Sequence, residues 1–134
     1  VLFRSGARIV DLAAECQESD CQVRFAMVPV GAGPASGELL VVLETEIPRI
    51  GAASPTTQVR KRYYVYPGND THDEVSEAML QTLTRKPFRF SRALHTTAHF
   101  KIGKLLRPLA ANVYVYDRNK VLVRHERRAI ESEE

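Results

Sequence analysis

Long apolar runs are missing from this chain of 134 residues. None approaches the roughly 20 consecutive apolar residues that a membrane-spanning helix needs, so the sequence predicts no transmembrane segment. Hydrophobic residues still make up 44% of the chain and charged residues 26%, which is typical of a globular protein and argues against disorder. We expect a single β-rich domain over residues 1–134, in which 127–134 is a charged and frayed tail.

Cysteine is scarce as well, since Cys16 and Cys21 are the only two. A structural zinc site needs four ligands, and no other cysteine or histidine lies near enough in sequence to suggest the remaining ones. The spacing is also wider than that of a Cys-x-x-Cys redox motif. His95 and His99 are four residues apart, which would bring them together on a helix but separates them by about 13 Å on a strand. No metal or other cofactor is therefore predicted.

Catalytic motifs are absent too. The glycine-rich stretch 31–37 leads into a strand-like run rather than a helix, so it does not match a phosphate-binding loop. Glu44 and Glu46 share a strand face, but no second element converges on them in the sequence. We expect a protein that is not an enzyme. An active site assembled from residues far apart in sequence stays open as an alternative.

Acidic residues are missing between Glu77 and Asp117. The same interval holds seven lysines and arginines, which we call the basic strip: Arg85, Lys86, Arg89, Arg92, Lys101, Lys104 and Arg107. An uneven charge of this kind favours an anionic partner. The basic strip, around residues 85–107, therefore predicts a non-catalytic module that binds another protein or an anionic macromolecule, or a subunit of a larger assembly. The compartment and the oligomeric state are not indicated.

Nucleic acid is the alternative partner. The segments 59–66 and 85–92 interleave basic residues with aromatic ones, and basic groups neutralise phosphates while aromatic rings stack on the bases of a single strand. On a strand, however, Phe88 and Phe90 would point into the core while Arg89 points to water. The rings would then be unavailable for stacking, so both interpretations stay open.

The dominant pattern that is present is an alternation of apolar and polar residues, which is typical of half-buried strands. The segments 8–16 and 21–28 match on one face when the chain folds about residues 17–20, with Cys16 opposite Cys21 and Val10 opposite Met27. This register places the Cα atoms of the two cysteines roughly 4.5–5.5 Å apart, within reach of a disulfide. The redox state of the compartment decides whether that bond forms.

Further strands are predicted at 38–47, which is the most continuously apolar and therefore central, and at 56–66, 88–94 and 96–102. The segment 112–127 predicts a last hairpin, in which Asp117 pairs with Val121 around a three-residue loop. Asn119 is the residue expected to take positive φ in that loop. In this arrangement Val113, Val115, Val121 and Val123 share one face.

One amphipathic helix is predicted over residues 70–86. Thr71 and Glu74 form a capping-box pattern, apolar residues recur every four positions, and Pro87 ends the helix. Because only one of its faces is apolar, the helix should lie against a sheet. About seven strands with one helix indicate a mainly β fold, either an antiparallel β-sandwich or a partly open barrel. The alternative is an α+β fold with the helix packed on a single antiparallel sheet.

Overall fold

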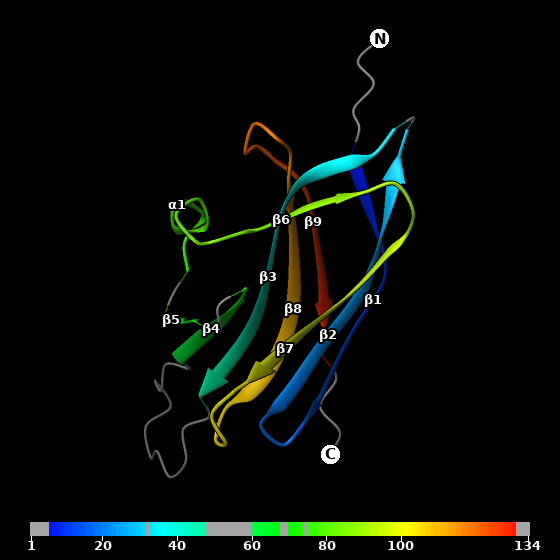
Figure 1. Cartoon of the computed structure of the whole chain (residues 1–134). Helices are drawn as coiled ribbons and strands as arrows, with labels where there is room; N and C mark the ends of the chain where they lie inside the picture. Colours follow the sequence, from blue (N-terminus) through cyan, green and yellow to red (C-terminus); the bar gives the residue numbers. More distant parts are fainter. Residues whose placement is uncertain (1–5, 32, 48–59, 68–69, 74, 131–134) are drawn as a thin grey trace.

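The computed structural model describes residues 6–31, 33–47, 60–67, 70–73 and 75–130. These residues form nine strands and one short helix, arranged as two antiparallel sheets that pack on each other (Figure 1). The predicted antiparallel β-sandwich is therefore confirmed, and the alternative with a single sheet is wrong. Within the described residues, no helix is long and apolar enough to cross a membrane.

The smaller sheet has three strands in the order β1 (Gly6–Gln17), β2 (Asp20–Val30) and β7 (Leu94–Lys101). The larger sheet has six strands, of which five follow one another as β5 (Asp70–Asp73), β4 (Arg60–Tyr66), β3 (Ala35–Ile47), β8 (Arg107–Tyr116) and β9 (Leu122–Ala129). The sixth strand, β6 (Lys86–Phe90), pairs with β3 alone. As predicted, β3 is central.

The strands β4 and β6 lie end to end along the same edge of β3. Residues 35–39 of β3 pair with β6, whereas residues 41–47 pair with β4. Residues 38–46 of β3 pair with β8, which must therefore occupy the opposite edge. This arrangement brings the end of β4 beside the start of β6, although the two are separated in sequence.

The main core lies between the two sheets and is built by alternate residues of neighbouring strands. In β2 and β3 these are Val23, Phe25, Met27, Leu39, Val41 and Leu43. The residues between them on β3 face the other side of the larger sheet, where Leu40 and Val42 belong to a second apolar cluster. The alternation of strand side chains therefore explains why β3 is apolar on both faces.

The register of the first hairpin is confirmed at its turn and wrong at its far end. The two cysteines lie opposite each other as predicted, but Ile9 rather than Val10 lies opposite Met27. The cause is a β-bulge after Val10, where Asp11 has a φ of 56°. An extra residue in one strand turns the side chains beyond it to the other face, and this brings Ile9 into the core.

A disulfide joins Cys16 and Cys21, whose Cα atoms are 4.0 Å apart. The turn beyond it is shorter than predicted, because Gln17 already pairs with residue 20 and only Glu18 and Ser19 remain unpaired. The carbonyl oxygen of Ser19 also accepts a hydrogen bond from the backbone of the β7–β8 connection. At this end of the sandwich, at the bottom of Figure 1, a disulfide thus pins the β1–β2 hairpin and a hydrogen bond ties its turn to the β7–β8 connection.

The helix predicted over 70–86 is wrong in its extent. Residues 70–73 form β5 and pair with β4, while α1 covers only Glu77–Leu80 and β6 has begun by Lys86. The observed N-cap is Ser76, whose hydroxyl accepts a hydrogen bond from the backbone of Met79. Residue 74 and the side chain of Thr71 lie outside the described part of the chain. The open edge of β4 offers backbone partners to residues 70–73, and this tertiary pairing prevails over the local capping pattern.

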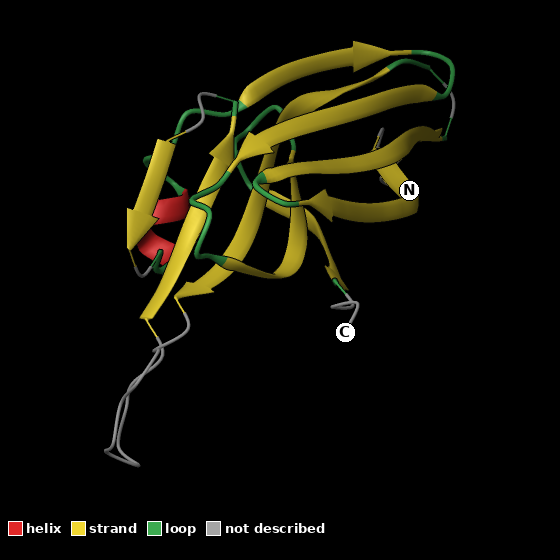
Figure 2. Ribbon diagram, turned by 90° about the horizontal axis from the view of Figure 1, so that it is seen from below, coloured by secondary structure: helices red, strands yellow, loops and turns green. Residues whose placement is uncertain are grey.

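The short helix does lie against a sheet, as predicted. Leu80 is buried in the second apolar cluster, and Val75 and Leu83 pack against it from either side of α1. This cluster covers part of the outer face of the larger sheet, so α1 lies outside the strand layers (Figure 2).

The chain stays in a strand further than the sequence predicts. β9 extends to Ala129, which pairs with Ala110, so the predicted frayed tail of 127–134 begins with strand residues. Arg127 is held in place by Glu44 of β3, which a frayed residue would not be. Residues 131–134 lie outside the described part of the chain.

Candidate functional site

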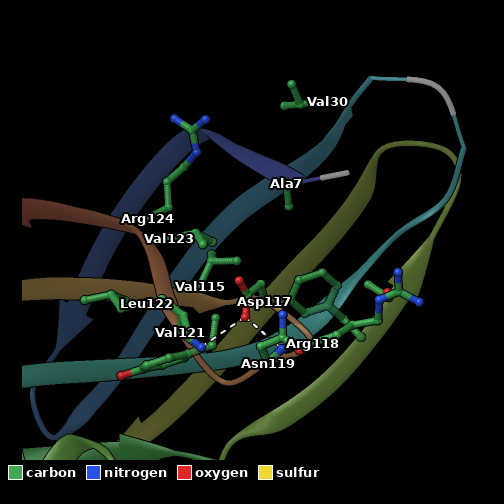
Figure 3. Close-up of a pocket in the computed structure, with 13 residues that line it drawn as sticks. Ala7, Val30, Val115, Asp117, Arg118, Asn119, Val121, Leu122, Val123 and Arg124 are labelled. Carbon is green, nitrogen blue, oxygen red and sulfur yellow. Dashed lines mark hydrogen bonds between the residues drawn. The ribbon is translucent and has the colours of Figure 1, made fainter. Parts of the chain in front are cut away.

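Two pockets lie at openings between the sheets. The hairpin pocket has a volume of about 490 Å³ and is lined by Ala7, Val30, Ser36, Phe88, residues 115–119 and residues 121–124 (Figure 3). The lysine groove has a volume of about 390 Å³ and is lined by Met27, Leu39, Tyr66, residues 86–89 and residues 94–97. Both volumes lie in the range of ligand sites, and the two pockets share the ring of Phe88.

The hairpin pocket lies at the end of the sandwich where β1 begins, β2 ends and β8 turns into β9. Ala7 and Val30 of the smaller sheet line it together with residues 117–119 and 121–124 of the larger sheet (Figure 3). This end is opposite to the one that carries the disulfide (Figure 1). The hairpin pocket and the disulfide therefore lie at opposite ends of the sandwich.

The turn between β8 and β9 is built around Asp117. Its backbone N–H donates to the carbonyl oxygen of Val121 at 2.9 Å, which confirms the predicted pairing. Its carboxylate accepts from the backbone N–H groups of Asn119 at 2.8 Å and Val121 at 3.0 Å (Figure 3). Lys120, rather than Asn119, takes the positive φ of 64°. Three-residue hairpin loops place the left-handed residue last, which explains the correction.

The first residues of β9 do not pair as the regular alternation requires. A β-bulge opposite the end of β8 shifts the register, so that Val115 lies opposite Arg124 while Tyr116 lies opposite Leu122. Val123 is therefore the extra residue, and it is not part of the core cluster that contains Val115. Val121, Leu122 and Val123 remain 56%, 41% and 37% exposed, and all three line the hairpin pocket.

Exposed apolar side chains gather at the hairpin pocket. The described residues expose six large hydrophobic side chains, and four of these line the pocket: Val30, Val121, Leu122 and Val123. Single exposed apolar residues are normal on a protein surface, whereas a contiguous group marks an interaction site. This clustering distinguishes the hairpin pocket from the rest of the described surface.

The charges beside the hairpin pocket are mainly positive. Arg118 and Arg124 line it and Lys120 lies in the same turn, and all three residues are exposed. Asp117 is the one acidic residue among those that line the pocket, and its Oδ1 atom is occupied by the turn. The pocket therefore combines apolar side chains with a positive rim.

The structure places two residues of the basic strip in ion pairs. Arg85 is nearly buried, with its side chain 8% exposed, its Nε atom 3.5 Å from Glu38 Oε1 and its guanidinium 4.1 Å from the centre of the Tyr116 ring. Arg107 has an Nη1 atom 3.7 Å from Glu46 Oε1. Their charges are at least partly neutralised within the chain, which leaves less for a partner.

The other five residues of the strip fall into two groups. Lys86 and Arg89 line the lysine groove, and Arg92 lies in the short connection from β6 to β7. Lys101 ends β7 and Lys104 follows it in the β7–β8 connection. Since a strand rises about 3.3 Å per residue, Lys101 lies about 23 Å from the start of β7. The structure thus does not gather all seven residues on one surface.

The aromatic residues of the strip face the core, as the strand pattern predicted. Phe90 is buried between the sheets, and Phe88 is half-buried and packs against the same core. The centres of the two rings are 5.6 Å apart. Rings in this position offer little face to a nucleic-acid base.

A polar network that sequence reasoning missed ties three strands of the larger sheet together. The Asn112 side-chain amide donates to Glu44 Oε1 at 2.6 Å, and Arg127 Nε donates to the same oxygen at 3.2 Å. Because its nitrogen faces Glu44, the Asn112 amide presents its oxygen to His125 Nε2 at 2.8 Å. The His125 ring stacks on Tyr114, with 4.2 Å between ring centres. The one available signal in the sequence was the position of Asn112, an amide side chain within a segment predicted as a strand.

The network shifts the pKa values of its members. Burial alone would raise the pKa of the Glu44 carboxyl, but the hydrogen bonds from Asn112 and Arg127 and the charges of Arg127 and Lys61 hold it below its ordinary value. Burial lowers the pKa of His125, against the effect of nearby carboxylates. None of the network residues lines either pocket, so the network works as a tie between strands.

The two histidines of the HTTAH segment lie on β7 and are exposed, so the interpretation of this segment as a strand is confirmed. Among the described residues, no group of three or more His, Cys, Asp and Glu is placed to hold a metal ion.

In comparisons with known proteins, no protein-family model and no curated protein matches the chain. Among solved structures, that of β-glucosidase 3B from Thermotoga neapolitana in complex with glycerol is similar at 10% sequence identity and a TM-score of 0.42. The similarity covers 98% of this chain and 16% of the glucosidase chain. A likeness of this strength carries no argument about function.

Proposed function

We propose that this chain is a non-catalytic protein-binding module, and that its hairpin pocket receives a short partner segment with apolar side chains next to acidic ones. The observation that carries the proposal is the gathering of four exposed apolar side chains at this one pocket. Contiguous apolar surface beside polar residues is typical of protein interaction sites.

The charge of the pocket supports an acidic partner. Arg118, Lys120 and Arg124 surround the apolar side chains, while the Asp117 carboxylate is engaged by backbone N–H groups of its own turn. Complementary charge steers a partner and sets its register. A segment that places leucine or valine in the pocket and aspartate or glutamate beside it would match both features.

The basic strip supports this function less than the hairpin pocket does. Arg85 and Arg107 are ion-paired, and Lys101 lies about 13 Å along β7 beyond Thr97, the last residue of β7 that lines the lysine groove. We therefore place the protein partner at the hairpin pocket and treat the lysine groove separately.

A selection from a random peptide library displayed on phage tests the proposal. We expect enriched peptides to combine large apolar residues with Asp or Glu. Leu122→Glu should weaken binding of the enriched peptide at least roughly tenfold, since it places a charge in the apolar pocket and repels the acidic residues. Leu105→Glu is the matched control, because Leu105 is 71% exposed and does not line the pocket.

Two results would contradict the proposal. One is that no peptide is enriched over an unrelated control protein. The other is that Leu122→Glu and Leu105→Glu bind the enriched peptide as the unaltered protein does.

The nucleic-acid alternative has weaker support because the aromatic rings of the strip face the core. A salt titration of single-stranded oligonucleotide binding measures how many residues of the basic strip contact phosphates. Engagement of all seven residues would give a log–log slope near −5, at about −0.7 per neutralised phosphate. Arg89 and Arg92 alone would give a slope near −1.4 by the same relation.

A further inference from the structure

The lysine groove lies where the smaller sheet meets the edge of the larger one. β7 borders it on one side, and the end of β4 and the start of β6 border it on the other. Met27 and Leu39 are fully buried beneath it, and Leu94 is 39% exposed at its side. The apolar surface that the groove exposes therefore comes from Leu94 and from the half-buried Phe88.

Two hydrogen-bond donors meet in this groove. Lys86 Nζ donates to the Tyr66 hydroxyl at 2.9 Å, and the same ammonium lies 5.4 Å from the centre of the Tyr66 ring. Lys86 has three N–H donors, so at least one more can serve a ligand. The Tyr66 oxygen accepts from Lys86 and leaves its own O–H free to donate. Thr96, which is half-buried, adds a third hydroxyl to the lining.

The groove contains no acidic residue to balance this ammonium. Its lining residues include Lys86, Arg89 and His95 but neither aspartate nor glutamate. No carboxylate forms an ion pair with Lys86 among the residues that the structure describes. A positive group beside exposed apolar side chains is complementary to a molecule with an anionic group and an apolar body.

We propose that the lysine groove binds a small carboxylate with an apolar chain, whose carboxylate accepts hydrogen bonds from Lys86 Nζ and the Tyr66 hydroxyl while the chain covers Leu94 and Phe88. The exposed apolar side chains favour an acyl chain over a fully hydrated anion such as free phosphate. This inference is independent of the proposed protein-binding function, because it concerns another pocket.

Isothermal titration calorimetry with three probes tests the inference. We expect octanoate to bind with saturation, because it combines the charge with the chain. Octylammonium has the same chain with the opposite charge, and acetate has the charge without the chain, so both should bind at least roughly tenfold more weakly. Equal binding of octylammonium or of acetate, or no saturable octanoate binding, would overturn the proposal.

Two variants locate the site. Lys86→Gln removes the ammonium and should weaken octanoate binding at least roughly tenfold, as expected for loss of a charge-assisted hydrogen bond. Leu94→Glu adds a negative charge at an exposed position of the groove and should weaken octanoate in the same way without disturbing the core. The second variant keeps the test decisive if the first one fails to fold.

Two controls complete the experiment. Lys101→Gln removes an exposed lysine at the other end of β7 and should leave octanoate affinity unchanged. Leu122→Glu alters the hairpin pocket and should also leave it unchanged. If Leu122→Glu rather than Lys86→Gln abolished octanoate binding, the ligand would lie in the hairpin pocket and the proposal would be wrong.

Discussion

The hairpin pocket and the lysine groove share the ring of Phe88, yet they offer a ligand different chemistry. In the hairpin pocket four apolar side chains are exposed, and three of them, Val121, Leu122 and Val123, lie at the β-bulge where the register of β9 shifts. In the lysine groove the exposed features are the side chain of Leu94 and an ammonium held by a phenol. The comparison teaches that strand register decides which side chains an opening of the sandwich presents.

The wall between the two pockets gives the prediction with the largest effect. Gly37 of β3 pairs with Phe88, and a Cβ added to it would meet the backbone carbonyl oxygen of Tyr116 and lie 3.1 Å from the Phe88 ring. Because a strand backbone must move to relieve this contact, Gly37→Ala should lower the free energy of unfolding by about 3 kcal/mol. The affinities for the selected peptide and for octanoate should fall together, since both pockets are lined by Phe88.

Gly103→Ala is the matched control for that experiment. A Cβ at residue 103 would meet only side-chain carbons of Leu106 at 3.5 Å, an ordinary contact. Urea denaturation of both variants measures the two effects, and that of Gly103→Ala should stay within about 0.5 kcal/mol. Equal stability of the two variants would show that the wall can move freely, and the pockets could not then be treated as fixed by register.

The disulfide between Cys16 and Cys21 gives the prediction with the next largest effect on stability. Replacing both Cys16 and Cys21 with alanine removes a link that closes a short loop, which should lower the free energy of unfolding by about 2 kcal/mol. The pockets are not lined by either cysteine, so peptide and octanoate affinities should not change. Thermal unfolding with and without a reducing agent measures the first effect on the unaltered protein. A loss of binding in either pocket would show that the disulfide helps to hold the strands that line that pocket.

An exchange of variants tests directly whether the two pockets are distinct. Leu122→Glu should weaken the selected peptide and spare octanoate, and Lys86→Gln should do the reverse, each by about tenfold, which is about 1.4 kcal/mol. Calorimetry of both variants with both ligands measures the four affinities. If each variant weakened both ligands, one connected site would replace the two pockets described above.

The strand pattern predicted those parts of the fold that depend on local alternation. The cysteine register, the inward rings of Phe88 and Phe90 and the pairing of Asp117 with Val121 all follow from the period of two. The pattern failed where a single extra residue changes the face. The bulge at Asp11 has no sequence signature of its own. An aspartate adopts positive φ only occasionally, so its presence in a strand does not indicate a bulge.

The candidate sites depend on contacts that the sequence separates. Lys86 and Tyr66 meet because β4 and β6 lie end to end along β3, and no local pattern encodes that arrangement. The alternation predicted that Val121 and Val123 share a face with Val113 and Val115, but it predicted neither the bulge in β9 nor the exposure of Val121, Leu122 and Val123. The basic strip was visible as a run of charge, but its division between ion pairs, groove and far strand end is a property of the tertiary fold.

The smallest predicted effect tests whether the outer face of the larger sheet is independent of both pockets. Burial holds the pKa of His125 below its ordinary value, so the folded protein binds fewer protons here than the unfolded chain does. Stability from this group is present above the ordinary histidine pKa of about 6.5 and decreases as the pH falls below it. His125 as a whole residue is exposed although its ring stacks on Tyr114, and solvent screening limits the effect to a few tenths of a kcal/mol. Urea denaturation at pH 7.5 and 5.5 should show this decrease in the unaltered protein and a smaller one in His125→Gln.

Because His125 lines neither pocket, the variant should bind the selected peptide and octanoate within about twofold of the unaltered protein. A larger change would mean that the network on the outer face positions the strands around the pockets, and the two-pocket comparison would have to include it.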